Sequence, residues 1–233
     1  VTWGSNDWGA DSSSVSDELN SGVVDIFTNP RAYAALKDDG SVITWGNGSS
    51  GDSSAVAQEL INVVDIYSTS ESFAAIREDG SVITWGRSDF GGNSNSVASE
   101  LADGVTEIFS TQTAFAALKS NGSVVTWGSS NNGGDSSSVS NELSAEVITI
   151  ASTKQAFAAI HSDGTVTTWG DSESGGDAPT AIGIDGNVVT SITSNDSAFA
   201  ALTDSGSVLA WGDSTRGGDT SGVANLLESG VVS

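Results

Sequence analysis

Residues 107–148 read EIFSTQTAFAALKSNGSVVTWGSSNNGGDSSSVSNELSAEVI, and variants of this phrase recur along the whole chain. The most constant part is a Trp-Gly pair after an apolar segment, and six of the seven tryptophans occupy this position. They are Trp3, Trp45, Trp85, Trp127, Trp169 and Trp211, and their spacings are 42, 40, 42, 42 and 42 residues. Repeats of this length with several short apolar segments are typical of β-propellers and other stacked arrays. The sequence therefore predicts an all-β repeat protein.

Each unit is predicted to contain three short strands. In the unit quoted above, with the two residues before it, we expect them at Val105–Ser110, Ala114–Lys119 and 123–127. A Lys-Ser-Asn-Gly turn joins the second strand to the third, because glycine takes the positive-φ position of a tight hairpin and Asn or Asp tolerates the position beside it. A Gly-rich loop and a Val-x-x-Glu-Leu turn follow the third strand. We expect the Val and Leu of this turn to cover the edge of the blade.

The repeat sets the domain organisation. The chain is predicted to be a single repeat domain with a partial blade at 1–24 and repeats at 25–64, 65–106, 107–148, 149–190 and 191–233. The 40-residue unit lacks one residue after Trp45 and another between Leu60 and Val63, and both gaps fall outside the predicted strands, where deletions are tolerated.

The two ends of the sequence are out of phase with whole blades. Residues 1–3 correspond to a third strand, and residues 229–233 begin a new first strand. We expect the natural polypeptide to continue and to close a ring of six or seven blades. The alternative is an open array, whose free edge favours self-assembly.

Composition excludes several classes of function. The formal net charge is −23, and the seven Lys and Arg form no cluster, which argues against nucleic-acid binding because phosphate affinity depends on basic residues. No apolar stretch approaches the length that spans a bilayer. The absence of Cys rules out disulfides and thiolate metal sites. An acidic chain without Cys or Met suits a secreted or cell-surface protein in a salt-rich exterior.

A family resemblance follows from the motifs. The order V-x-x-I, then A-F-A-A-L-K-x-D-G-x-V-x-x-W-G and a Gly-rich loop resembles the RCC1-like repeat, and the short units are most similar to the β-lactamase inhibitory protein II branch. Ser/Asp-rich versions also resemble repeats in large secreted proteins of marine cyanobacteria. The resemblance implies a β-propeller with three-stranded blades of about 42 residues. It does not imply the RCC1 exchange activity, because the histidine that the repeat usually places before the second strand is absent. The matching positions are Ala32, Ser72, Ala114, Ala156 and Ala198.

Candidate binding residues lie where the repeats differ. The positions just before the second strands vary, and we expect them to form a ring on one propeller face: Arg31, Glu71, Thr113, Lys154 and Asp196. None is aromatic, so the ring lacks the usual anchors of an enzyme inhibitor, and a protein-inhibitor propeller stays an alternative through the family resemblance alone. Trp8 and Phe90 occupy equivalent loop positions and can stack on sugar rings, which leaves a carbohydrate-binding propeller as an alternative.

Catalytic chemistry has little support in the sequence. His161 is the only histidine, and its place beside a hairpin turn predicts an exposed residue rather than a member of a catalytic triad. No cofactor is expected. Calcium is the one ion that the Gly-rich loops suit, through acids that recur in five of six copies, although the same acids also serve as loop caps. These positions are Asp11, Asp52, Asp135, Asp177 and Asp219, with Asn93 in the sixth.

The predicted function is therefore a non-enzymatic structural or adhesive module of a larger extracellular or cell-surface bacterial protein. We expect its partner to be a protein or a surface polysaccharide, bound through loops of one face or through an open edge.

Overall fold

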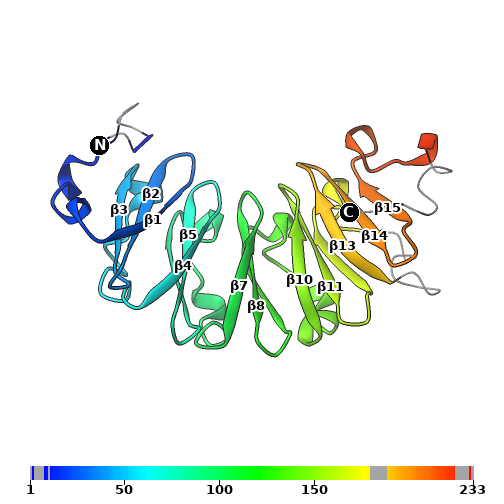
Figure 1. Cartoon of the computed structure of the whole chain (residues 1–233), viewed down its shortest axis with the longest axis horizontal. Helices are drawn as coiled ribbons and strands as arrows, with labels where there is room; N and C mark the ends of the chain where they lie inside the picture. Colours follow the sequence, from blue (N-terminus) through cyan, green and yellow to red (C-terminus); the bar gives the residue numbers. More distant parts are fainter. Residues whose placement is uncertain (1, 3–7, 10, 179–187, 224–230, 232–233) are drawn as a thin grey trace.

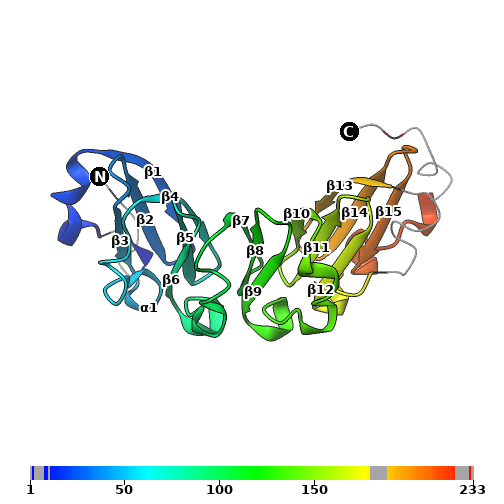
Figure 2. The same cartoon turned by 90° about the horizontal axis from the view of Figure 1, so that it is seen from below.

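The computed structural model describes residues 2, 8–9, 11–178, 188–223 and 231 of the chain. These residues form five three-stranded antiparallel sheets, and in each sheet the strands are arranged in the order of the sequence. We call the sheets blades 1 to 5. The blades stand one after another along an open arc, with blade 1 and blade 5 at its opposite ends (Figures 1 and 2).

The strands of the five blades correspond closely. The first strands are β1 (Val23–Thr28), β4 (Val63–Ser68), β7 (Val105–Ser110), β10 (Val147–Ser152) and β13 (Val189–Ser194). The second strands are β2 (Ala32–Lys37), β5 (Ser72–Arg77), β8 (Ala114–Lys119), β11 (Ala156–His161) and β14 (Ala198–Thr203). The third strands are β3 (Val42–Gly46), β6 (Val82–Gly86), β9 (Val124–Gly128), β12 (Val166–Gly170) and β15 (Val208–Gly212). The predicted all-β architecture of three-stranded blades is confirmed.

The third strand begins one residue later than predicted. In blade 3 the side chain of Asn121 accepts hydrogen bonds from the backbone N–H and the hydroxyl of Ser123, at 3.0 and 2.7 Å. Ser123 is therefore the last residue of the turn, and β9 begins at Val124.

Short helices follow most of the third strands. They are α1 (Gly48–Gly51) and the 3-10 helices η2 (Ser13–Val15), η3 (Glu18–Asn20), η4 (Ser88–Phe90), η5 (Asn95–Val97), η6 (Ser130–Asn132), η7 (Ser137–Val139), η8 (Glu142–Ser144), η9 (Ser172–Ser174), η10 (Ser214–Arg216) and η11 (Ser221–Val223). The leucine of the Val-x-x-Glu-Leu turn is buried in three of these loops, at Leu60, Leu101 and Leu143. The turn covers the blade edge as predicted.

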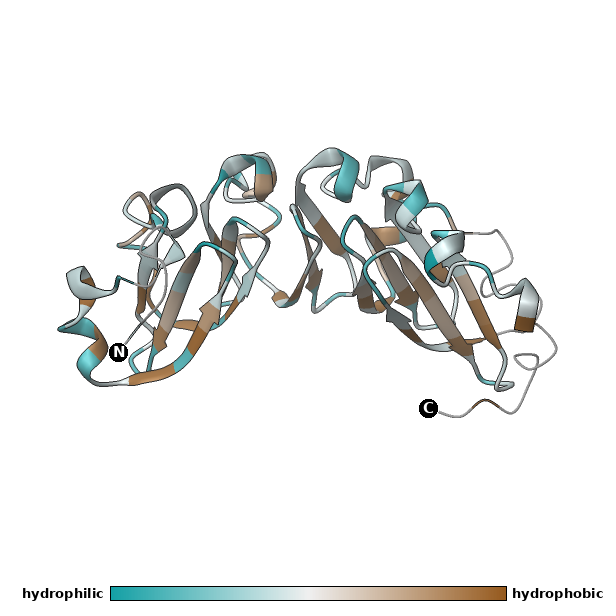
Figure 3. Ribbon diagram, turned by 90° about the horizontal axis from the view of Figure 1, so that it is seen from above, coloured by the Kyte–Doolittle hydropathy of each residue, from teal (hydrophilic) through white to brown (hydrophobic). Residues whose placement is uncertain are grey.

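The hydrophobic core lies between neighbouring blades. At the junction of blades 3 and 4, Ala114, Ala116 and Leu118 of the second strand pack against apolar residues of the next blade, which include Phe157 and Trp169. Small alanines let the sheets approach, and the same scheme recurs at the other three junctions of the described chain. Apolar residues accordingly follow the strands, and polar residues gather in the loops (Figure 3).

Each blade also stacks an aromatic pair across its second and third strands. Phe115 and Trp127 are typical, with ring centroids 5.2 Å apart. The indole nitrogen then bonds to the loop of the preceding blade: Trp127 donates to the carbonyl oxygen of Gly91, and Trp169 to that of Gly133, both at 3.0 Å. Only glycine fits there, because a Cβ on Gly133 would lie 2.5 Å from the ring of Phe157, and φ is +96°.

The short repeat disturbs one junction. One of its two missing residues falls in the loop that holds α1, between blades 1 and 2. Among the described residues, the three buried side-chain atoms that lack a hydrogen-bond partner all surround this loop: Asn29 Nδ2, Ser50 Oγ and Trp85 Nε1. The predicted gap therefore lies outside the strands, but it leaves polar groups unsatisfied.

At the far end, a sixth unit begins in register. The N–H of Val231 donates to the carbonyl oxygen of Gly206 at 2.9 Å, as that of Val189 does to Gly164. This places Val231 where the first strand of another blade starts. The predicted third strand at residues 1–3 falls mostly outside the described residues.

Candidate functional site

Two sets of loops meet at one end of the blades, which we call the upper face. The turns between first and second strands contribute residues 29–31, 69–71, 111–113, 153–155 and 195–197. The loops after the third strands lie beside these turns, since Arg87 donates its N–H to the carbonyl oxygen of Glu71 at 3.0 Å. The hairpins between second and third strands lie at the opposite end, the lower face.

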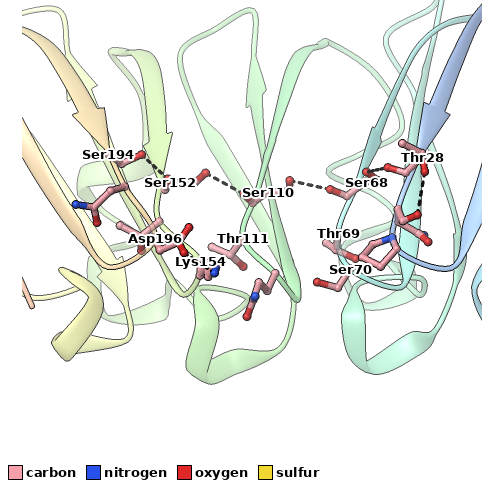
Figure 4. Close-up of a pocket in the computed structure, with 15 residues that line it drawn as sticks. Thr28, Ser68, Thr69, Ser70, Ser110, Thr111, Ser152, Lys154, Ser194 and Asp196 are labelled. Atoms are coloured by element: carbon pink, nitrogen blue, oxygen red, sulfur yellow. Dashed lines mark hydrogen bonds and ion pairs between the residues drawn. The ribbon is translucent and has the colours of Figure 1, made fainter. Parts of the chain in front are cut away.

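The inner rim of the upper face is held by a hydroxyl ladder (Figure 4). In blades 2 to 5, a serine hydroxyl at the end of the first strand donates to the carbonyl oxygen of the matching residue in the preceding blade. The bonds run from Ser68 to Thr28, Ser110 to Ser68, Ser152 to Ser110 and Ser194 to Ser152, at 2.6 to 2.9 Å. The ladder fixes the spacing of all five blades.

A pocket of about 460 Å³ opens inside this rim. Besides the ladder residues, its wall includes Pro30, Ser70, Gln112, Lys154 and Asp196, one from each blade. Lys154 and Asp196 form an ion pair of 2.5 Å across the junction of blades 4 and 5. The pocket is lined mainly by hydroxyl and amide groups, so its chemistry suits polar ligands.

The five predicted ring residues occupy two different rings. Lys154 and Asp196 face the inner pocket, whereas Arg31, Glu71 and Thr113 stand one residue further along their turns, against the outer loops. Thr113 accepts a hydrogen bond from the side-chain amide of Asn132 at 2.8 Å. It belongs to the turn–loop contact of blade 3.

The structure brings four of the predicted residues together in one cluster. Glu71, whose side chain is only 9% exposed, pairs with Arg31 at 3.3 Å and with Arg87 at 3.2 Å. The guanidinium carbon of Arg31 lies 5.7 Å from the ring centroid of Trp8, and that of Arg87 lies 4.6 Å from the centroid of Phe90. We call these five residues the Trp–Arg cluster.

The cluster is ordered by reciprocal contacts. Two guanidinium groups satisfy a nearly buried carboxylate, and each is itself held over an aromatic ring by cation–π attraction. Trp8 remains 55% exposed, so the cluster presents a broad apolar surface beside fixed cationic groups. Such a surface suits the recognition of a binding partner.

Sequence reasoning missed Arg87, and it assigned the aromatic residues and the turn residues to separate sites. One signal was available. Glu71, Arg87 and Phe90 all depart from the repeat within a single unit, whereas the positions equivalent to Arg87 are Asn47, Ser129, Asp171 and Asp213. Aromatic side chains are absent from the turns themselves, as predicted, but the neighbouring loops supply two.

The recurring loop residues act as caps at five of the six positions; at Asp177 the matching residue is Pro179, which has no N–H to donate and lies outside the described residues. The side chain of Asp135 accepts the N–H of Ser137 at 2.9 Å, and the same bond occurs at Asp11, Asp52, Asn93 and Asp219. These hydrogen bonds lower the pKa of the Asp135 carboxyl. Within the described chain, no group of three or more His, Asp or Glu residues is placed to hold a metal ion. Calcium binding stays a prediction.

The expectation that His161 is exposed is wrong. His161 is only 7% exposed, and its Nε2 lies 2.9 Å from the Thr167 hydroxyl. The ring folds back over the third strand because it is too short to follow the course of the lysines at equivalent positions.

Known proteins share this blade. The family model for the regulator of chromosome condensation (RCC1) repeat matches residues 189–217, which hold the three strands of blade 5. Human WBSCR16 has a TM-score of 0.53 at 18% identity, over 89% of this chain and 65% of that chain. Prp20p from Saccharomyces cerevisiae has a TM-score of 0.52 at 16% identity, over 85% and 58%. The fold is an RCC1-like array of propeller blades.

The ectodomain of the receptor kinase CR4 from Physcomitrella patens is also similar in structure, with a TM-score of 0.52 at 16% identity, over 84% of this chain and 54% of that one. The chain thus spans 54% to 65% of the length of these three structures. A search of curated proteins gave no match. Among the described residues, no helix has the length and apolar character needed to cross a membrane.

Proposed function

We propose that this chain is a non-enzymatic binding module of an extracellular or cell-surface protein, and that it holds a protein partner through the Trp–Arg cluster. The observation that carries the proposal is the geometry of Glu71, which is nearly buried between Arg31 and Arg87 while both guanidinium groups stack on aromatic rings. Trp, Tyr and Arg are the residues most enriched in the hot spots of protein interfaces.

Charge supports the choice of the upper face. The chain has a net charge of −23 and only seven Lys and Arg. Four of the seven lie on the upper face, at Arg31, Arg87, Lys154 and Arg216. A partner with carboxylates among apolar groups would complement the Trp–Arg cluster and avoid the acidic remainder of the molecule.

Solved structures offer precedents for the setting. The RCC1-like fold is found in a receptor-kinase ectodomain, and the structure of Prp20p is described together with its binding to Gsp1p and histones. At 16% identity these structures are precedents for the use of the fold only. The partner of this chain is inferred from its own Trp–Arg cluster.

The test compares variants of the immobilised chain against two probe sets: a displayed library of secreted and surface proteins, and a glycan array. Arg87→Ala and Trp8→Ala remove parts of the Trp–Arg cluster. Asn132→Ala and Arg216→Ala serve as controls, because these residues occupy in blades 3 and 5 the loop position that Trp8 and Phe90 occupy in the cluster. We expect protein ligands to bind about thirtyfold more weakly to the cluster variants, a hot-spot loss of about 2 kcal/mol, and unchanged to the controls.

Protein ligands that bind all four variants equally would contradict the proposal. Consistent glycan binding that Trp8→Ala abolishes would instead favour the carbohydrate-binding alternative, in which Trp8 stacks on a sugar ring. Circular dichroism of each variant checks that the fold is intact.

A further inference from the structure

Two blades seat a lysine ammonium on the loop of the preceding unit. At the lower face, Lys119 Nζ donates to the carbonyl oxygen of Glu100 at 2.5 Å, and Lys37 Nζ does the same to Glu18 at 2.5 Å. Lys119 also lies 3.5 Å from the Asp103 carboxylate, and its side chain is only 16% exposed. The carbonyl of the Val-x-x-Glu-Leu turn is therefore an ammonium acceptor within this fold.

Blade 4 keeps the acceptor but lacks the lysine. The turn is present as Glu142-Leu143, yet the position of Lys119 holds His161, whose imidazole bonds to Thr167 instead. Ala145 stands where Asp103 would complete the seat. In the described chain, no side chain of blade 4 donates to the carbonyl oxygen of Glu142.

A hollow of about 380 Å³ remains at this place. Its wall includes Glu142 and Glu146 from the vacant turn and His161, Asp163, Thr165 and Thr167 from the facing hairpin. His161 is more than nine-tenths buried and lines the hollow, with its Nε2 held by the Thr167 hydroxyl at 2.9 Å. The hollow thus lies beside the turn that seats a lysine in blades 1 and 3, and its wall is largely polar.

Glu146 adds a carboxylate to the wall of the hollow, beside the place of the missing lysine stem. It has φ +65°, at a position where blade 3 has Gly104 with φ +71°. A Cβ on Gly104 would lie 3.4 Å from Cε of Lys119, which is ordinary van der Waals contact. By analogy, Cβ of Glu146 stands beside the path that an alkylammonium chain would follow to the carbonyl of Glu142.

We propose that this hollow binds a primary ammonium group on an unbranched alkyl chain, which takes in blade 4 the place that Lys119 takes in blade 3. The shared chemistry is that of a lysine side chain or a polyamine. The ammonium donates to the Glu142 carbonyl, and the carboxylates of Glu142, Glu146 and Asp163 around the hollow favour its charge. The site lies at the lower face, so it is independent of the Trp–Arg cluster.

The test is a nuclear magnetic resonance titration of the whole chain with Nα-acetyl-lysine methylamide. Nα-acetyl-norleucine methylamide, which has an alkyl stem but no ammonium group, is the control probe. We expect amide shifts confined to residues 142–146 and 161–165 with the lysine probe, and binding at least about tenfold weaker with norleucine. Spermidine and a lysine-containing pentapeptide are titrated in the same way. Tighter binding of spermidine indicates a polyamine ligand, and tighter binding of the pentapeptide indicates a lysine side chain of a protein.

Two reciprocal variants make the test specific. His161→Lys supplies the ammonium from the chain itself and should lower the affinity for the lysine probe at least about tenfold. Lys119→His should open a second hollow and add shifts at residues 100–104. Equal binding of both probes, or an unchanged affinity in His161→Lys, would overturn the proposal. If one variant fails to fold, the other decides alone.

Discussion

The junction of blades 3 and 4 and the junction of blades 1 and 2 use the same apolar scheme but differ in polar contacts. In the former, Trp169 bonds to Gly133, and the N–H of Gln112 donates to the carbonyl oxygen of Lys154 at 2.9 Å. In the latter, Trp85 Nε1 has no partner, and Pro30 has no N–H to donate.

At the junction of blades 1 and 2, an ion pair takes the place of the missing backbone hydrogen bond. The Arg31–Glu71 ion pair crosses the junction of blades 1 and 2, one residue along the turn from Pro30. The difference teaches that the surface of the Trp–Arg cluster stands on the least regular part of the array. Departure from the repeat creates the site and leaves buried polar groups unpaired near it.

The largest expected effect comes from the glycine that the short loop lacks. Gly133→Ala should destabilise the protein by about 3 kcal/mol or more. The new Cβ would lie 2.5 Å from the ring of Phe157, and the alanine would have to adopt a positive φ. Gly48→Ala in the short loop should change stability by less than about 0.5 kcal/mol, since its Cβ meets nothing within 4 Å. Urea unfolding measures both, and equal effects would refute the proposed difference between the two loops.

The tryptophans give the next contrast. Trp169→Phe should cost about 1–3 kcal/mol more than Trp85→Phe, because only the former loses a hydrogen bond and leaves the Gly133 carbonyl oxygen unpaired. Both substitutions remove the same ring volume, so the volume contribution is similar. Thermal and urea unfolding of the two variants provide the comparison, and indistinguishable losses would contradict it.

Lengthening the short loop should improve the weaker junction. Replacing residues 47–52 by the sequence of 129–135 restores the missing residue and should stabilise the protein by about 1–2 kcal/mol, because Asn29 and Trp85 recover acceptors. Asn195 shows that an asparagine fits the longer loop, since its side-chain amide donates to the carbonyl oxygen of Arg216 at 2.8 Å. As a control, the same graft with its first Gly of the Gly-Gly pair changed to Ala should lose the gain. A graft that leaves the melting temperature unchanged would count against this account.

The smallest effect concerns acid. Hydrogen bonds from the residue two positions on lower the pKa of Asp39, Asp79 and Asp163 in the lower-face turns. Their folded pKa values lie below the unfolded value of about 3.9, so this stability is present in full above about pH 4 and is lost as the pH falls through the folded values.

Blade 3 has Asn121 in the same turn with the same two bonds, and asparagine does not titrate there. The triple variant with Asn at positions 39, 79 and 163 should therefore lose less stability than the natural sequence on acidification below about pH 4. Urea unfolding across this range measures the loss, and parallel curves for the two proteins would exclude the effect.

Much of this architecture was predictable because the repeat reports it five times. The phase of the tryptophans, the Gly turns and the position of the deletions all follow from comparison of one unit with another, and β7 and β8 have the predicted bounds. Strands and tight turns of this kind are determined mainly by residues that are close in sequence, so tertiary contacts alter them little.

The site was less accessible to the same reasoning. Arg31 and Glu71 belong to different blades, and their contact depends on how far one sheet is rotated against the next. Adjacent residues of one turn also face different ways, so Lys154 reaches the inner pocket while Gln155 bonds toward the outer loops. The burial of His161 follows from side-chain length, which a pattern of strand ends does not encode.

The hydroxyl ladder has a consequence for how such arrays change over generations. Each rung needs one hydroxyl and one carbonyl oxygen, and the carbonyl is present whatever residue stands there. A gene that gains or loses a whole unit therefore still encodes matching neighbours on both sides of the new boundary. Recombination can therefore change the length of the arc by one blade at a time. The residues of the upper face can change independently of the ladder.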